Sequence, residues 1–209
     1  MKKIVLTLTV LVIGLSAVAY DMSSTTIQND GNKTRAQKAR DAWEKDMAEF
    51  RARSEHNRQL RELADSIASI QAGAAVKNRD FVLEADNVTF RNGMTAFVNS
   101  TTNFISVKGN RAVVQISPSS FSSGPNGLGG VTVDGMISGL EVRTDKKGNT
   151  TLSMNVMGIG INAQVEIYMT PGSNRASATI YPNFNSNTVW MEGNIVPYQN
   201  SSVIEGSSL

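Results

Sequence analysis

Apolar and polar residues alternate through the second half of the chain, and this alternation constrains the fold more than any other feature. It is clearest at Ile159, Ile161, Ala163, Val165, Ile167 and Met169. A strand turns successive side chains to opposite faces, so a period of two predicts strands with one buried face. Runs rich in Gly, Asn, Asp and Pro divide these segments at residues 108–110, 145–149 and 171–174. Residues 79–206 are therefore predicted to form a mainly β domain, an antiparallel sandwich or barrel of roughly 8–10 strands.

Residues 33–78 show a different period, with apolar side chains three and four positions apart and no proline. This spacing predicts a long, charged, amphipathic helix before the strands. Its apolar stripe consists of Ala36, Ala39 or Arg40, Trp43, Met47, Phe50, Leu60, Leu63, Ile67, Ile70 and Ala74. We expect the second half of the helix to dock on the β domain through this stripe. Acidic and basic side chains alternate around it at spacings that favour intrahelical pairs, which indicates a solvated face rather than a surface for lipid or polysaccharide.

The first nineteen residues have the three parts of a secretory signal peptide. Lys2 and Lys3 precede an uncharged apolar run over residues 4–15, and a small-x-small pattern ends at Ala19. We expect cleavage between Ala19 and Tyr20, followed by a flexible polar leader over residues 20–32. The apolar run is shorter than the about 20 residues that span a bilayer, and the mature chain has no second such run. The predicted location is the periplasm of a Gram-negative cell, or outside the cell.

The chain contains no cysteine. Disulfides, thiol nucleophiles and zinc–thiolate sites are therefore excluded, although an exported protein could form disulfides. A lipid anchor of the bacterial lipoprotein type is excluded as well, because its lipid is attached to a cysteine.

Several motifs of the β region, in their order and spacing, resemble a family catalogued as domain of unknown function 4251, found in Bacteroides and relatives. The resemblance rests on residues 79–86 (RDFVLEAD), 103–105 (NFI), 124–135 (GPNGLGGVTVDG) and 145–149 (DKKGN), and it extends over residues 79–206 with the preceding helix included. It implies an exported or lipid-anchored protein of the cell envelope with no assigned activity. The missing cysteine separates this chain from the lipid-anchored members.

A glycine-rich stretch over residues 117–130 is the most suggestive candidate for ligand contact. It leads into a strand and lacks the lysine of a phosphate-binding loop, so a long connection is the simpler interpretation. Within it, Phe121, Asn126 and Leu128 are our candidate ligand contacts, because long loops often form the rim of a binding site.

No residue is predicted to be catalytic or to bind a metal, and no cofactor is predicted. His56 is the single histidine and lies among charged helix residues, where a solvated side chain is expected. Among the acids of the β region, Asp134 and Glu166 are the two whose burial would matter, since a pair of carboxylates suffices for hydrolysis of a glycosidic bond.

Three functional hypotheses follow. The first is a non-enzymatic envelope module with a helical arm, whose partner is a small apolar or peptide ligand or an envelope protein. The alternatives are an acid-dependent hydrolase acting on an envelope or glycan substrate, and a structural or oligomerisation module built on the helix. Aromatic residues make up 6% of the chain, too few to indicate stacking platforms for sugars or single-stranded nucleic acid, and nucleic acid is not an expected partner.

Overall fold

The computed structural model describes residues 33–117, 130–159, 161–183 and 187–206. In these residues one helix precedes the strands, and a single turn of 3-10 helix follows them. The elements are α1 (Arg35–Asn78), β1 (Asp80–Phe90), β2 (Thr95–Phe97), β3 (Phe104–Lys108), β4 (Arg111–Ile116), β5 (Val131–Thr144), β6 (Thr150–Gly158), β7 (Asn162–Met169), β8 (Arg175–Pro182), β9 (Val189–Pro197) and η2 (Tyr198–Asn200).

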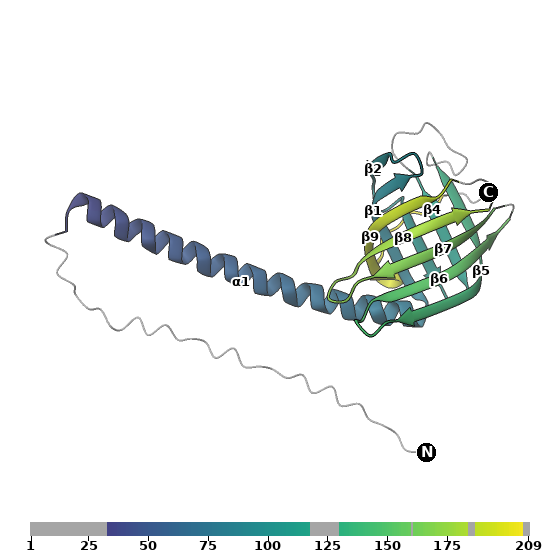
Figure 1. The fold of residues 1–209 in the computed structure, drawn as a ribbon, viewed down its shortest axis with the longest axis horizontal. Helices are drawn as coiled ribbons and strands as arrows, with labels where there is room; N and C mark the ends of the chain where they lie inside the picture. Colours follow the sequence, from purple (N-terminus) through teal and green to yellow (C-terminus); the bar gives the residue numbers. More distant parts are fainter. Residues whose placement is uncertain (1–32, 118–129, 160, 184–186, 207–209) are drawn as a thin grey trace, which may run out of the picture. The chain divides into compact units, whose positions relative to one another are not determined.

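The strands form one antiparallel sheet that closes on itself (Figure 1). Each strand from β3 to β8 pairs with the next in sequence, and β1 pairs with both β3 and β9. In the closing pair Leu83 lies opposite Ile195. The short strand β2 adds to β1 outside this ring. The fold is therefore a barrel of eight strands rather than a sandwich.

The three predicted turns join β3 to β4, β5 to β6 and β7 to β8. Each places a glycine in the left-handed region, Gly109, Gly148 and Gly172, with φ of 62°, 87° and 84°. This conformation costs glycine little because it has no Cβ. The alternation from Ile159 onward was predicted too long, because β6 ends at Gly158 and β7 begins at Asn162. The strand β2 was not predicted.

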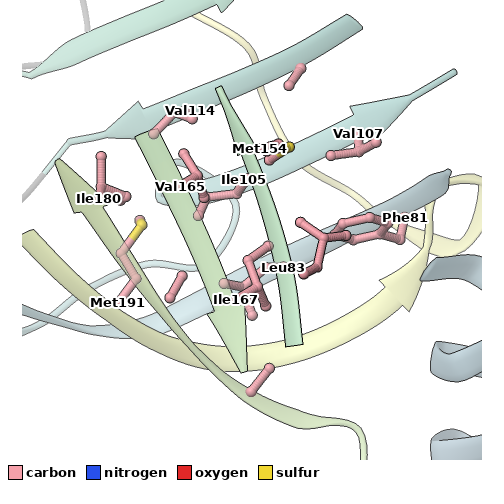
Figure 2. Packing of buried hydrophobic residues seen from close by; sticks show 14 of the residues in the cluster. Phe81, Leu83, Ile105, Val107, Val114, Met154, Val165, Ile167, Ile180 and Met191 are labelled. Atoms are coloured by element: carbon pink, nitrogen blue, oxygen red, sulfur yellow. The ribbon is translucent and has the colours of Figure 1, made fainter. Parts of the chain in front are cut away.

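Apolar side chains from every barrel strand meet in one cluster inside the ring (Figure 2). Along β7 the buried side chains are Ala163, Val165, Ile167 and Met169, and those between them are exposed. An eight-stranded barrel encloses an interior just wide enough for such side chains. The barrel is thus organised around an apolar core, and its polar side chains lie on the outer face.

The helix contacts this core through small residues and not through its predicted apolar stripe. Contacts divide the chain into two compact units, residues 1–53 and 54–209. The part of the helix that contacts the barrel belongs to the second unit. Ala72, Ala75 and Val76 are buried in the barrel cluster. The large aliphatic side chains Leu60, Leu63, Ile67 and Ile70 are all exposed. The prediction that they dock was wrong, because the buried face of the helix is the one that carries Ala72, Ala75 and Val76.

The chain after β9 covers part of the outer face of the barrel; we call residues 198–206 the C-terminal strap. Val82, Phe104 and Val113 form a second apolar cluster on the outer face. Val196, Tyr198 and Val203 pack against them. The strap is held by polar contacts as well, such as the Ser201 hydroxyl donating to Glu84 at 2.7 Å. The last described residues are therefore part of the folded domain.

Candidate functional site

A shallow depression lies on the outer face of β7, β8 and β9, which we call the outer depression. Its lining residues are Tyr168, Thr170, Arg175, Ala176, Ser177 and Glu192. Its volume of about 290 Å³ is near the lower end of ligand sites, which range from about 300 to 1,000 Å³. This space accommodates one side chain or one small polar group.

The register of the three strands brings the main lining residues together. Tyr168 lies opposite Ser177, and Ser177 lies opposite Glu192. Directly opposed residues on one face of antiparallel strands have Cβ atoms about 4.5–5.5 Å apart. A phenol ring, a hydroxyl and a carboxylate therefore form one row across the depression.

Arg175 borders this row and is held by an acid from the other side of β9. Its guanidinium donates to both carboxylate oxygens of Asp86, at 2.5 and 2.9 Å. Asp86 lies at a bulge in β1, between Ala85 and Asn87. The side-chain hydrogen bond to Asp86 raises the pKa of Arg175 above its ordinary value, so this cation stays protonated. Glu192 lies 4.0 Å from Arg175, beyond hydrogen-bond distance, which leaves its carboxylate able to accept another donor.

Two more aromatic residues share the outer face with Tyr168. Tyr168, Tyr181 and Trp190 are exposed by 42, 42 and 41%, and they come from β7, β8 and β9 in turn. Trp190 lies opposite Thr179, and Tyr181 lies opposite Gln164. The aromatic content of the chain is low, but the fold gathers part of it on one polar sheet face. Composition alone could not show this.

The depression presents a phenol, a hydroxyl and a carboxylate, groups that can hold a ligand by hydrogen bonds and charge. The carboxylate opposite the Ser177 hydroxyl is that of Glu192. The single histidine, His56, is exposed on α1. Within the described residues no group of three or more His, Cys, Asp or Glu side chains is placed to hold a metal ion.

Of the site candidates singled out from the sequence, the structure describes Glu166 and Asp134, and neither lines the outer depression. Phe121, Asn126 and Leu128, and the cleavage position at Ala19 and Tyr20, lie outside the described residues, so they stay predictions. Glu166 is exposed on the outer face of β7, where Gln164 donates to it at 3.1 Å. Asp134 is partly buried on β5, but its partner is a cation.

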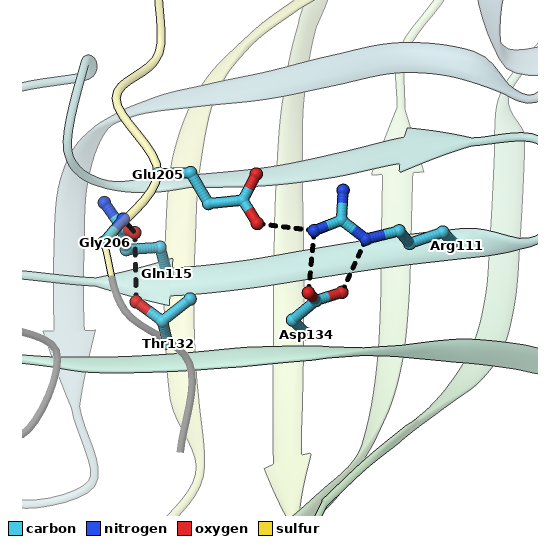
Figure 3. A network of polar contacts seen from close by, with 6 residues as sticks. All are labelled: Arg111, Gln115, Thr132, Asp134, Glu205 and Gly206. Carbon is cyan, nitrogen blue, oxygen red and sulfur yellow. Dashed lines mark hydrogen bonds and ion pairs between the residues drawn. The ribbon is translucent and has the colours of Figure 1, made fainter.

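That cation is Arg111, which joins Asp134 to the C-terminal strap (Figure 3). It donates to both oxygens of Asp134, at 2.8 and 2.7 Å, and to Glu205 at 2.6 Å. The side-chain hydrogen bond to Asp134 raises the pKa of Arg111, which therefore stays protonated. Because one guanidinium engages both carboxylates, this cluster is a structural clamp and not the acid and base pair of a glycosidase.

Comparison with known proteins places the chain among relatives without an assigned activity. Residues 65–195 match the family described as a domain of unknown function (DUF4251). The chain is similar to the crystal structure of a DUF4251 family protein from Bacteroides eggerthii DSM 20697, with 48% identity and a TM-score of 0.59. The match covers 67% of this chain and 94% of that one. No curated protein matches. In the described part of the chain, no helix is both long enough and apolar enough to cross a membrane.

Proposed function

Because the chain belongs to the DUF4251 family, whose description names no activity, we propose its function from its own surface: it is a non-enzymatic module that binds a peptide segment at the outer depression. The observation that carries the proposal is the row formed by Tyr168, Ser177 and Glu192 inside that depression. The ligand we propose is a peptide that presents a basic side chain.

The chemistry of the row favours a cation. Glu192 offers a carboxylate that Arg175 does not reach within hydrogen-bond distance. Tyr168 lies in the same row and presents a half-exposed ring, whose face attracts a lysine or arginine side chain. The neighbouring Arg175 makes two hydrogen bonds to Asp86 and only a long ion pair, at 4.0 Å, with Glu192. A small apolar ligand would leave these polar groups without partners.

Binding of short peptides that differ only in their central residue tests this proposal. Peptides with lysine, glutamate or leucine at the centre are titrated into the protein and followed by NMR chemical shifts. We expect the lysine peptide to bind, with shifts at Tyr168, Ser177 and Glu192. The Glu192→Gln variant should weaken this binding by about tenfold, since it removes one charge-assisted hydrogen bond worth roughly 1.5–3 kcal/mol.

Glu166→Gln is the matched control, because Glu166 lies on the same sheet face but outside the depression. It should leave the affinity for the lysine peptide unchanged. Equal affinity for all three peptides, or equal weakening by both variants, would contradict the proposal.

We further propose that the protein works outside the cytoplasm, after removal of residues 1–19. The positively charged start, the apolar run and the small-x-small pattern at Ala19 support this. Amino-terminal sequencing of the protein recovered from a periplasmic extract should begin at Tyr20. A protein that still begins at Met1 would rule this out.

A further inference from the structure

Four large aliphatic side chains on α1 lie in a row without a partner; we call Leu60, Leu63, Ile67 and Ile70 the helix stripe. They are 51, 61, 56 and 73% exposed. Single exposed apolar residues are ordinary on protein surfaces, but a contiguous row of them marks an interaction site. The row belongs to the same compact unit as the barrel, so its exposure beside the docked helix face is a property of the folded domain.

The helix stripe points away from the barrel. A helix advances by 100° per residue, so the buried residues Ala72, Ala75 and Val76 lie on one face of α1 and the stripe lies on the opposite one. The barrel therefore does not obstruct a partner that approaches the stripe. A partner that binds the stripe would also not disturb the contact between the docked face of α1 and the barrel.

The spacing of the stripe fits another helix. Its members are separated by three, four and three residues, which is the alternation of core positions in a heptad repeat. Such side chains pack into the gaps between the side chains of a facing helix that has the same repeat. The stripe spans eleven residues, or about 16 Å of helix.

The flanks of the stripe suit a second copy of this chain. The residues that flank its core positions are uncharged, namely Gln59, Ala64, Ser66 and Gln71. Two identical helices therefore meet there without repulsion between like charges, and the small Ala64 and Ser66 permit close approach. The charged residues of these turns, Arg61, Glu62 and Asp65, occupy other faces of the helix.

We propose that the protein self-associates into a dimer in which the helix stripes of two copies pack against each other. This does not depend on the peptide site, which lies on β7, β8 and β9 and is formed by other residues. Four side chains per copy make a smaller contact than the about 800 Å² per partner of a standard interface, so we expect a dissociation constant in the micromolar range.

Sedimentation velocity on the chain from Tyr20 to Leu209 tests the proposal. At about 100 μM a micromolar dissociation constant gives mainly dimer. The Leu63→Glu variant should be monomeric at that concentration, with its dissociation constant raised by at least about tenfold, because each copy would bury a carboxylate in an apolar contact. Since Leu63 is exposed, the variant should have the same thermal unfolding midpoint as the unchanged chain has when it is diluted to a monomer.

Arg61→Glu is the control. It introduces a carboxylate on another face of α1, two positions before Leu63, and it changes the net charge by more than Leu63→Glu does. It should dimerise as the unchanged chain does. The chain has no cysteine, so Ile67→Cys offers a second measurement: under mild oxidation it should form a disulfide-linked dimer where the two helices run parallel, whereas Arg61→Cys should form none in either orientation. A chain that stays monomeric at about 100 μM, whether or not it captures another protein or lipid vesicles, would overturn the proposal. So would dimerisation that Leu63→Glu leaves intact.

Discussion

Gln115 shows how a single polar residue attaches the C-terminal strap to the barrel. It lies on β4 and is fully buried. Figure 3 shows its contacts with Thr132 and Gly206. Its amide nitrogen donates to the backbone oxygens of Thr102 and Ile204, at 3.0 and 2.8 Å. Its amide oxygen accepts from the Thr132 hydroxyl and the Gly206 backbone N–H, at 3.0 and 2.7 Å. All four hydrogen-bonding positions of the side chain are thus used.

Replacing Gln115 by leucine should therefore destabilise the fold by about 2–4 kcal/mol, since several buried polar groups lose their partner at once. Urea unfolding measures this change. Gln164→Leu is the control, because Gln164 is exposed on β7 and its substitution should change stability by less than about 0.5 kcal/mol. Similar losses in both variants would contradict the role assigned to Gln115.

The residues of the outer depression could not be identified from the sequence, and the reason is physical. Tyr168, Ser177 and Glu192 lie on three different strands, and each occupies the polar phase of its own strand. In that phase a solvated side chain is the default expectation. Only the register between the strands makes them neighbours, and composition and spacing along the chain do not give that register. The same holds for Asp134, whose pairing with Arg111 joins adjacent strands.

At the level of elements, the turn between β5 and β6 is organised by one carboxylate. Asp145 accepts hydrogen bonds from the backbone N–H groups of Lys147 and Asn149, at 2.8 and 2.9 Å, and from the Asn149 side chain at 2.7 Å. These bonds favour the ionised form. The side-chain bond from Asn149 contributes most, and the pKa of Asp145 lies below its ordinary value of 3.8.

A lowered pKa in the folded state means that the turn is stabilised while Asp145 is ionised. This contribution is fully present above the unfolded pKa of 3.8 and disappears as the pH falls through the folded pKa. Asn149→Ala should raise the pKa of Asp145 towards 3.8, as followed by NMR titration of its carboxyl group. Asn155→Ala, on the outer face of β6, should leave that titration unchanged. An unshifted pKa in Asn149→Ala would show that the side-chain bond is not its main cause.

The helix illustrates what periodicity does and does not reveal. The spacing of apolar residues and the absence of proline predicted a helix over 33–78, and α1 spans Arg35–Asn78. The same pattern predicted the wrong docking face, because it identifies the most apolar side of a helix and not the side that fits a neighbour. Ala72 and Ala75 carry little apolar weight in a sequence pattern, yet they lie on the buried face of α1.

For the whole molecule, the decisive feature is the closure of the sheet. The alternating pattern and the turn residues predicted the strands and their hairpins, but a sandwich and a barrel share both. They differ here in one pairing, β1 with β9, which joins segments more than 100 positions apart, such as Phe81 and Pro197. Local sequence signals do not extend over that distance, so they do not distinguish a barrel from a sandwich.

A glycine makes this closure sterically possible. A Cβ placed on Gly193 would lie 2.0 Å from the Glu84 carbonyl oxygen and 2.7 Å from the Ala85 Cα, both in the backbone of β1. Gly193 lies opposite Ala85, next to the bulge of the closing pair. Gly193→Ala should therefore force β1 and β9 apart and destabilise the fold by about 3 kcal/mol or more, as measured by urea unfolding.

The chain also has a glycine at which substitution by alanine should have the opposite effect on stability. Gly73 lies within α1, and a Cβ placed on it meets no atom within 4 Å. Gly73→Ala should therefore stabilise the protein by up to about 1 kcal/mol, because alanine loses less backbone entropy in a helix. One added methyl group thus has opposite effects, which depend on whether it enters the barrel closure or open space. If both variants unfolded at the same urea concentration as the unchanged protein, the closing pair could not be as tight as the distances at Gly193 require.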